Sequence, residues 1–261
     1  QSWCGMNKFL IIPVLFCLSL LSCSEDKKKI NESGADENQV ISGEGTVIPN
    51  VTFSQFEDSS SYPDAILELY TPLGNQVFKP GKVPFEFNVK NFDLQNNGGG
   101  DARLFMILNG GDPVGYLSPI FQRELTVGTY RTVAYLVDEA GFALKSFGNY
   151  VDRDFLVGDS RPFPYSAEPY LALHQPKNAQ IVPFGEDLVI DFLVLGGDMK
   201  LDELKVKLLV NEFFYSIDRM APVRVSNLPK GDYQVKVQLL RSDNKELEGP
   251  FSTISKTVFV R

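Results

Sequence analysis

Histidine, cysteine and tryptophan are scarce in this chain, and that scarcity limits the chemistry open to it. The 261 residues include one histidine, His174, one tryptophan, Trp3, and three cysteines, Cys4, Cys17 and Cys23. A Ser-His-Asp triad, or a zinc site with an imidazole ligand, would have to include His174. The same counts exclude a disulfide-rich scaffold and a metal centre built from several cysteines and histidines.

His174 has a counterpart elsewhere in the chain that argues against catalysis. Residues 171–176 repeat residues 67–72, so His174 takes the place of Tyr70. A position that is His in one copy and Tyr in the other is typical of a strand-end residue with a polar tip. We therefore predict neither a catalytic nor a metal-binding role for His174. We also predict no cofactor, since the sequence has no P-loop and no dinucleotide motif in a βαβ unit.

Paired carboxylates are the other side chains of this sequence that are suited to catalysis. Glycoside hydrolysis requires two Asp or Glu side chains at a set separation. The candidate pairs, Asp138-Glu139 and Asp202-Glu203, are adjacent in sequence. Neighbouring residues of a strand point to opposite faces, and in turns such acids are usually solvated. We therefore interpret both pairs as solvated turn acids and predict no catalytic residues and no enzyme activity.

Calcium binding is a further possibility for the acidic loops. Asp93, Asp101 and Asp112 lie in or beside loops rich in Gly and Asn. Such loops supply the oxygen ligands that Ca²⁺ prefers, but the EF-hand spacing is absent here. Asx-Gly turns also form without an ion. We predict no metal site, and the sequence leaves open whether these acids bind calcium.

The N-terminus has the composition of an export signal. Met6-Asn7-Lys8 is a short positive region, and residues 9–21 form an apolar run. That run is shorter than the roughly 20 residues that a membrane-spanning helix needs, but suits a signal peptide. It ends in Leu20-Leu21-Ser22-Cys23, which resembles the lipobox of bacterial lipoproteins. In that family the cysteine is diacylated and becomes the mature N-terminus.

The lipobox resemblance implies a membrane anchor at Cys23. It makes residues 1–22 a signal peptide, whose first five residues are interpreted as an upstream extension of the true start. An ordinary secretory signal cleaved nearby is the alternative. Two acyl chains suffice for stable anchoring, so no membrane-spanning helix is required of the rest of the chain.

Residues 23–63 are predicted to form a disordered, lipidated tether. They contain few large apolar residues, so they cannot bury enough surface to fold. Ser24 after the anchor resembles lipoproteins that are sent on to the outer membrane. Glu25-Asp26 resembles the surface-export signal of some Gram-negative groups, or is the start of a solvated linker. We expect a bacterial outer-membrane lipoprotein, facing either the periplasm or the cell surface.

The rest of the chain repeats itself at an offset of about 100 residues. Besides the match between residues 67–72 and 171–176, residues 85–89 match 190–194 at an offset of 105, and residues 125–130 match 228–233 at an offset of 103. Shifts of one or two residues in loops are typical of duplicated domains. The repeat predicts two homologous domains, residues 64–158 and 165–261, joined by a Pro-rich linker.

Periodicity within the repeats is that of β-strands. Apolar and polar residues alternate throughout residues 233–239, which indicates a half-buried strand. Residues 201–211 contain good helix formers, but their repeat partner, residues 103–109, ends in Asn-Gly-Gly and is strand-like, so we predict strands for both. Turns rich in Gly, Asn and Asp separate the runs.

The motif Leu-x-x-Gly-x-Tyr, ending at Tyr130 and again at Tyr233, resembles the tyrosine corner of immunoglobulin-like and fibronectin-like domains. The resemblance implies an all-β fold with two tandem immunoglobulin-like Greek-key β-sandwiches after the tether. The Cys…Trp…Cys core of antibody domains is absent.

Two aromatic runs, residues 116–121 and 213–215, do not alternate cleanly. Exposed aromatics can anchor glycan or protein ligands, but packing between the two domains is the interpretation we favour. The ligand-binding residues are therefore unknown.

The sequence points to a lipid-anchored envelope or surface protein that acts as a non-catalytic binding or adhesion module. Its partners would be the membrane, through the anchor, and a protein or a glycan. The alternative is a structural accessory subunit of an envelope or polysaccharide-uptake complex. Nucleic acid is excluded as a partner, because 25 Lys and Arg against 33 Asp and Glu leave no basic excess to neutralise phosphates.

Overall fold

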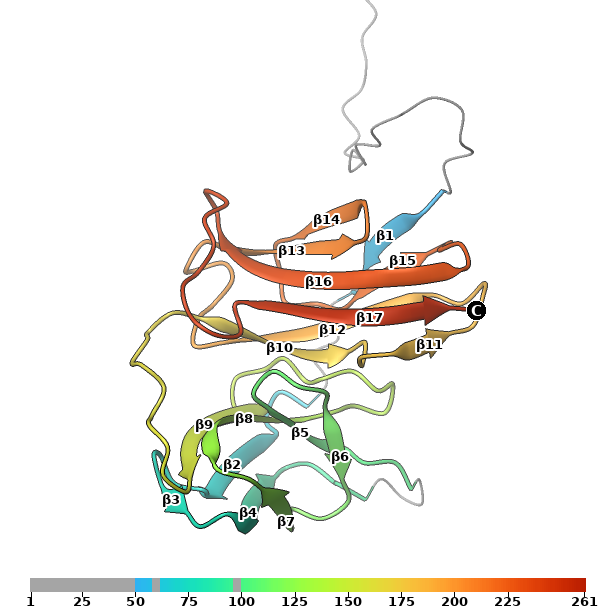
Figure 1. Ribbon diagram of the computed structural model, residues 1–261. Coiled ribbons are helices and arrows are strands. Elements are labelled where there is room, and N and C mark those ends of the chain that lie inside the picture. Colours follow the sequence, from blue (N-terminus) through green and yellow to red (C-terminus); the bar gives the residue numbers. More distant parts are fainter. Residues whose placement is uncertain (1–49, 58–61, 96–99) are drawn as a thin grey trace, which may run out of the picture. The chain divides into compact units, whose positions relative to one another are not determined.

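The computed structural model describes residues 50–57, 62–95 and 100–261. The expected signal peptide, Cys23 and the tether as far as residue 49 lie outside the described residues. Figure 1 shows strands β2–β9 grouped in one β-sandwich and β10–β17 in another, and both belong to one compact unit, Val47–Arg261. No helix in the described ranges is long and apolar enough to cross a membrane.

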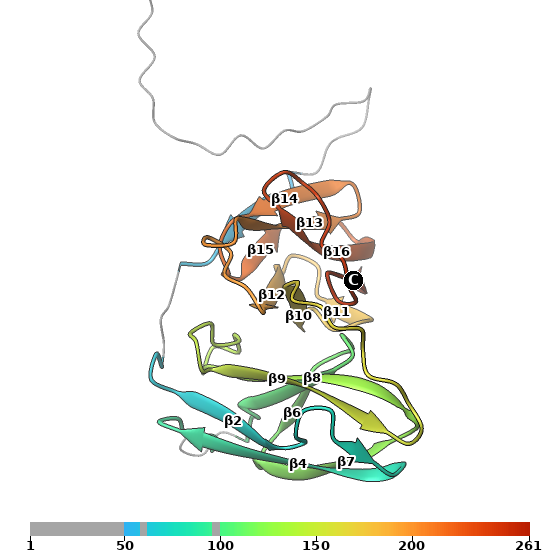
Figure 2. The same cartoon turned by 90° about the vertical axis from the view of Figure 1, so that its left-hand side faces the viewer.

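The first sandwich packs a three-stranded sheet, β2-β4-β7, against a five-stranded sheet, β3-β9-β8-β5-β6. The two layers are seen edge-on in Figure 2. Phe85 and Phe155 are buried between them with their rings 5.7 Å apart. Its strands are β2 (Ile66–Thr71), β3 (Val77–Phe78), β4 (Gly81–Lys90), β5 (Leu104–Leu108), β6 (Val114–Tyr116), β7 (Ile120–Leu125), β8 (Gly128–Leu136) and β9 (Tyr150–Val157).

The second sandwich repeats this arrangement strand for strand. Its sheets are β1-β15-β12-β10 and β11-β17-β16-β13-β14. Apart from β1, each strand occupies the position of its sequence repeat in the first sandwich. Its strands are β1 (Thr52–Gln55), β10 (Tyr170–Gln175), β11 (Gln180–Val182), β12 (Leu188–Leu195), β13 (Leu204–Val210), β14 (Phe213–Ile217), β15 (Val223–Ser226), β16 (Gly231–Arg241) and β17 (Thr253–Val260).

The predicted all-β fold, its duplication and its tyrosine corners are confirmed. The Tyr130 hydroxyl donates to the backbone oxygen of Thr126 at 2.9 Å, and the Tyr233 hydroxyl donates to that of Pro229 at 2.8 Å. In each sandwich the bond joins the start of a strand, β8 or β16, to the loop before it. The ambiguous stretch at residues 201–211 forms strand β13 preceded by a turn, as predicted from its repeat partner.

The predicted extent of the tether, residues 23–63, is wrong at its C-terminal end. Residues 52–55 form strand β1, which pairs antiparallel with β15 of the second sandwich. The physical reason is a short alternation: Val51 and Phe53 pack against the core of that sandwich, and Ser54 is exposed. The Phe53 ring stacks on Tyr215, with 5.4 Å between centroids.

Candidate functional site

The two sandwiches meet through one outer sheet face each. Strands β5 and β8 of the first sandwich contribute apolar side chains, and strands β10 and β12 of the second sandwich face them. Together they form an apolar cluster separate from the two sandwich cores: Ile107, Val133, Tyr135, Val137, Ala143, Tyr170, Ala172, Leu193 and Leu195. The sandwiches are therefore joined by a buried interface as well as by their linker.

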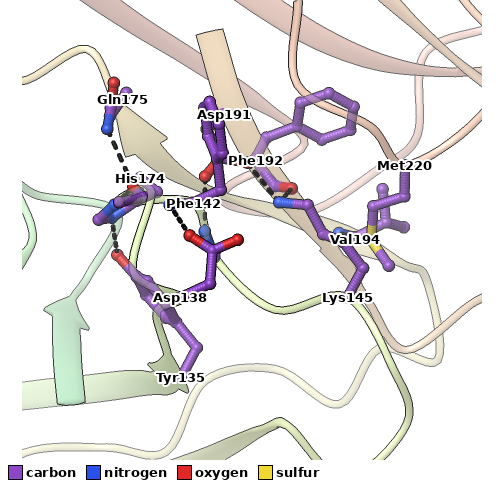
Figure 3. A network of polar contacts seen from close by, with 12 residues as sticks. Tyr135, Asp138, Phe142, Lys145, His174, Gln175, Asp191, Phe192, Val194 and Met220 are labelled. Atoms are coloured by element: carbon purple, nitrogen blue, oxygen red, sulfur yellow. Dashed lines mark hydrogen bonds and ion pairs between the residues drawn. The ribbon is translucent and has the colours of Figure 1, made fainter. Parts of the chain in front are cut away.

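A buried carboxylate from the second sandwich holds the loop that connects β8 and β9. Asp191, on β12, has no exposed surface. Its Oδ1 accepts from the Lys145 ammonium, and its Oδ2 accepts the backbone N–H of Ala143 at 2.7 Å. The Lys145 ammonium also donates to the backbone oxygen of Phe192 at 2.8 Å (Figure 3). Both oxygens of Asp191 are thus satisfied across the interface, which is what a buried charge requires.

His174 lies in the same interface with both ring nitrogens bonded. The backbone oxygen of Gly141 accepts from Nε2 at 3.0 Å, because a carbonyl has no proton to give. Nδ1 therefore accepts from the Tyr135 hydroxyl, which lies 2.9 Å away (Figure 3). Burial lowers the pKa of His174 and raises that of Tyr135. The neutral imidazole is a structural link between sandwiches, with its polar atoms in use.

The pH dependence of stability should report on His174. Because burial lowers its folded-state pKa below the unfolded value of about 6.5, the unfolded chain binds the proton first as the pH falls. The free energy of unfolding should therefore be highest above about pH 7 and fall below it by up to about 1.4 kcal/mol per pH unit, levelling off below the folded pKa. Urea denaturation between about pH 5 and 8 measures this, above the range in which most carboxylates titrate.

The control for this pH effect is His174→Gln, which keeps an N–H donor but has no titrating group. Since the chain has one histidine, this variant should show little change in stability with pH over the same window. An equal slope in the variant and the parent would contradict the assignment.

A cleft of about 470 Å³ lies beside His174, between the two sandwiches. The first sandwich lines it with the start of β5 and the loop after β8, and the second sandwich lines it with the end of β10 and the turn into β11. Most of the lining side chains are acids, amides or basic groups, with one aromatic ring: Asp101, Ala102, Arg103, Phe105, Val137, Asp138, Glu139, Gly141, His174, Gln175, Lys177 and Gln180.

The predicted turn acids Asp138 and Glu139 both line this cleft and have separate structural tasks. Asp138 accepts the backbone N–H of Phe142 at 2.9 Å, which closes its own turn. Glu139 accepts from Arg103 at 3.0 Å and from the Tyr62 hydroxyl. The Tyr62 bond is the largest cause of the lowered pKa of Glu139. Both carboxylates thus accept hydrogen bonds from within the first sandwich.

Arg103 is a buried cation that sequence reasoning did not identify as important. Its guanidinium donates to the backbone oxygens of Asp93 and Val137, at 2.9 and 3.2 Å, and lies 4.1 Å from the centroid of the Phe92 ring. It therefore fixes the wall of the cleft where β5 begins.

The three loop acids considered for calcium do not come together. Asp101 lines the cleft, and Asp93 caps its own turn through the N–H of Gln95. Asp112 accepts from the Lys256 ammonium at 2.7 Å and from the N–H of Asn178 at 2.9 Å, so it joins the two sandwiches. Burial would raise the pKa of Asp112, but these two donors outweigh burial and lower it. Among the described residues, no group of three or more His, Cys, Asp or Glu could hold a metal ion.

The acidic pair in the second sandwich is likewise a turn. Asp202 accepts the backbone N–H of Asp198 at 2.7 Å, and Glu203 follows it with a positive φ. These residues lie in the turn before β13.

The expectation that the two aromatic runs pack between the domains is wrong. Tyr116 stacks on Phe121 at 3.5 Å within the first sandwich. Phe213 and Tyr215 pack on the core of the second sandwich, and Phe214 is exposed. The aromatic side chains that belong to the buried interface cluster are instead Tyr135 of β8 and Tyr170 of β10.

A second set of aromatics in the interface surrounds Arg131, on β8. Its guanidinium makes two parallel bonds of 2.7 Å to Asp154 and lies 4.6 Å from the ring centroid of Tyr170. Phe163 and Phe251 flank it at 5.4 and 5.8 Å. The Tyr170 hydroxyl donates to Asp152 of the first sandwich. Strand β10 and the linker before it are held here against β8 and β9.

Comparison with known proteins yields neither a family nor a relative, since no family model and no curated protein matches the sequence. Among solved structures, the chain is similar to fibronectin(III)-like modules of CbhA from Clostridium thermocellum, with 15% identity and a TM-score of 0.30 over 75% of this chain and 94% of that one. It is also similar to three N-terminal domains of the highly immunogenic outer capsid protein of bacteriophage RB49, with 11% identity and a TM-score of 0.23 over 76% and 69%. The immunoglobulin-like assignment rests on the strand order of this chain.

Proposed function

We propose that this chain is a non-catalytic binding module of the bacterial cell envelope, which holds a glycan in the cleft between its two sandwiches. The observation that supports a binding role is the interface beside the cleft. A buried apolar cluster and charged contacts such as Lys145–Asp191 and Lys256–Asp112 connect the cleft's two walls. Because these contacts already hold the walls in place, a ligand that binds between them would not have to pay the entropic cost of ordering them, which favours affinity.

The lining of the cleft favours a polar, uncharged ligand over an apolar one. Gln175, Gln180 and Asp101 offer donors and acceptors of the kind that bind hydroxyl groups, and Phe105 adds an aromatic ring. Acids and Lys177 are both present, so neither sign of charge dominates. A segment of one or a few sugar units has this chemistry, whereas an extended protein interface requires a larger surface.

A glycan array probed with the full-length chain tests this function. Asp101→Ala and Lys177→Ala each remove an exposed side chain of the cleft. Each should lower the affinity for a ligand bound in the cleft about tenfold, which corresponds to a loss of about 1.4 kcal/mol in binding free energy. Asp243→Ala is the matched control, because Asp243 pairs with Lys245 on the surface, away from the cleft lining. Binding that responds equally to all three substitutions would contradict the cleft as the site.

We also propose that Cys23 carries the lipid that anchors the chain in the outer membrane. The support is the lipobox-like sequence at residues 20–23. Cys23→Ala should abolish labelling by radioactive palmitate and release the protein from membranes, whereas Cys17→Ala should change neither. Persistent labelling of the Cys23→Ala variant would overturn the assignment.

The rival function, a structural accessory subunit of an envelope complex, predicts a stoichiometric protein partner. Pull-down from solubilised membranes distinguishes the two. Recovery of a protein partner in a 1:1 ratio with this chain, together with no glycan binding, would favour the accessory-subunit function over the binding module.

A further inference from the structure

Strand β1 is an addition to the second sandwich, supplied by a segment far away in the sequence. Among the described residues, β10–β17 reproduce all eight strands of the first sandwich, so β1 has no counterpart there. It pairs antiparallel with β15, with Thr52 opposite Ser226 and Gln55 opposite Val223. The Phe56 N–H donates to the backbone oxygen of Pro222 at 2.9 Å and extends the pairing by one residue.

The segment fills a gap between two sheet edges. In the first sandwich the edges close directly, since Tyr116 of β6 stacks on Phe121 of β7 at 3.5 Å. In the second sandwich the Phe53 ring of β1 lies between β15 and β14, and it stacks on Tyr215 of β14 at 5.4 Å, nearly parallel. Val51 also packs on the sandwich core. Without β1, this edge would present an apolar groove and the unpaired backbone of β15.

We infer that this groove is a strand-acceptor site, and that residues 50–56 of a second copy of this chain can fill it in place of the chain's own β1. The chain's own β1 shows what kind of segment fits the groove, namely an extended strand with apolar side chains at residues 51 and 53. Every copy carries this segment, and adding a strand at an edge relies mainly on backbone bonds.

The connection to the first sandwich is a short hinge. Phe56 is bonded to Pro222 of the second sandwich and Tyr62 is bonded to Asn149 of the first, so five residues, 57–61, join the seated segment to the first sandwich. Short hinges favour exchange of an element between copies. The same donor and acceptor contacts form in either arrangement, so exchange leaves the strand pairing unchanged. The only difference is whether the hinge leads from the first sandwich to the second sandwich of the same copy or to that of another copy.

Donor and acceptor can be disabled separately. Phe53→Asp puts a carboxylate where an apolar ring packs, and so disables the donor. Because the Pro222 oxygen faces β1 and alternate residues of a strand share a side, the backbone N–H of Arg224 also faces β1. Arg224→Pro removes that donor at an edge, where proline is otherwise tolerated, and so disables the acceptor.

The test co-expresses two full-length copies with different C-terminal tags. A Phe53→Asp copy has an empty acceptor and an Arg224→Pro copy has a free donor, so this mixed pair should co-purify about tenfold more than two Phe53→Asp copies or two Arg224→Pro copies. Replacing Arg224→Pro by Arg224→Ala, which keeps the backbone N–H, should reduce recovery of the mixed pair, because that copy fills its own groove. Mixed pairs that co-purify no better than the matched ones would overturn the inference.

A peptide measurement keeps the test decisive if Arg224→Pro fails to fold. A synthetic peptide of residues 50–57 should bind the full-length Phe53→Asp chain and not the parent, whose groove is occupied. The same peptide carrying Phe53→Asp should bind neither. Failure of the native peptide to bind the Phe53→Asp chain would refute the acceptor site itself.

Discussion

Replacing Asp191 by alanine should lower the free energy of unfolding by about 3–5 kcal/mol, the usual cost of removing one partner from a buried ion pair. The carboxylate is fully buried and receives the Lys145 ammonium and the Ala143 N–H. Its removal leaves a cation at a side chain that is 21% exposed, together with a backbone donor that has lost its partner. Denaturation in urea, followed by fluorescence or circular dichroism, measures the loss.

Asp187→Ala is the matched control for the Asp191 variant. Asp187 also forms an ion pair, with Arg224 at 3.2 Å, but both side chains are more than a third exposed. Surface pairs contribute little, so this variant should stay within about 0.5 kcal/mol of the parent. Similar losses for Asp187→Ala and Asp191→Ala would show that burial of the Asp191 pair does not matter.

A second substitution can separate the lost pair from the stranded cation. Adding Lys145→Met to Asp191→Ala removes the uncompensated charge and should restore about 1–3 kcal/mol, since apolar residues can often replace both members of a buried ion pair at little cost. If the double variant is no more stable than Asp191→Ala, the loss comes from the Ala143 N–H and from packing.

The strands and the duplication were predictable because they depend on local alternation that occurs twice. In β16, Tyr233, Val235, Val237 and Leu239 face the core, as the sequence pattern required. The tyrosine corners were predictable for the same reason, since each depends on one residue and a backbone oxygen four residues before it. Where the pattern is short and not repeated, the prediction failed. Strand β1 has four residues, and its partner β15 is about 170 residues away.

The interface was not predicted, yet comparison of the two repeats carries a signal for it. Leu193 and Leu195 point outward from β12, and their counterparts in β4, at an offset of 105, are Asn88 and Lys90. In the five-stranded sheets the apolar outer face belongs to the first sandwich and the polar one to the second. Tyr135 points outward from β8, and its counterpart in β16, at an offset of 103, is Gln238.

Each sandwich therefore has one sheet with apolar side chains on its outer face as well as on its core face, and it is a different sheet in each. Those two faces meet. An apolar outer face in one copy, where its duplicate has a polar one, indicates a surface that another part of the protein covers. The cleft was beyond such reasoning, because its lining depends on how three loops approach one another.

Arg131→Ala should destabilise the other end of the interface by about 2–4 kcal/mol, through loss of the bidentate pair with Asp154 and of the stacking on Tyr170. The arginine side chain is 17% exposed, so water screens these contacts only in part. The bond to Asp154 is the largest cause of the raised pKa of Arg131, so the guanidinium is charged at every pH of interest. The loss is measured as for Asp191, by urea denaturation.

Two further variants separate charge from shape at Arg131. Arg131→Lys keeps the positive charge but cannot form two parallel bonds or lie flat on an aromatic ring, so it should recover less than half of the loss. Gln234→Ala is the control, because Gln234 is the repeat counterpart of Arg131 on the exposed outer face of β16, and its removal should cost no more than about 0.5 kcal/mol. Full recovery with lysine would mean that charge alone holds the linker and β10 against the first sandwich, and that the planar stacking is incidental.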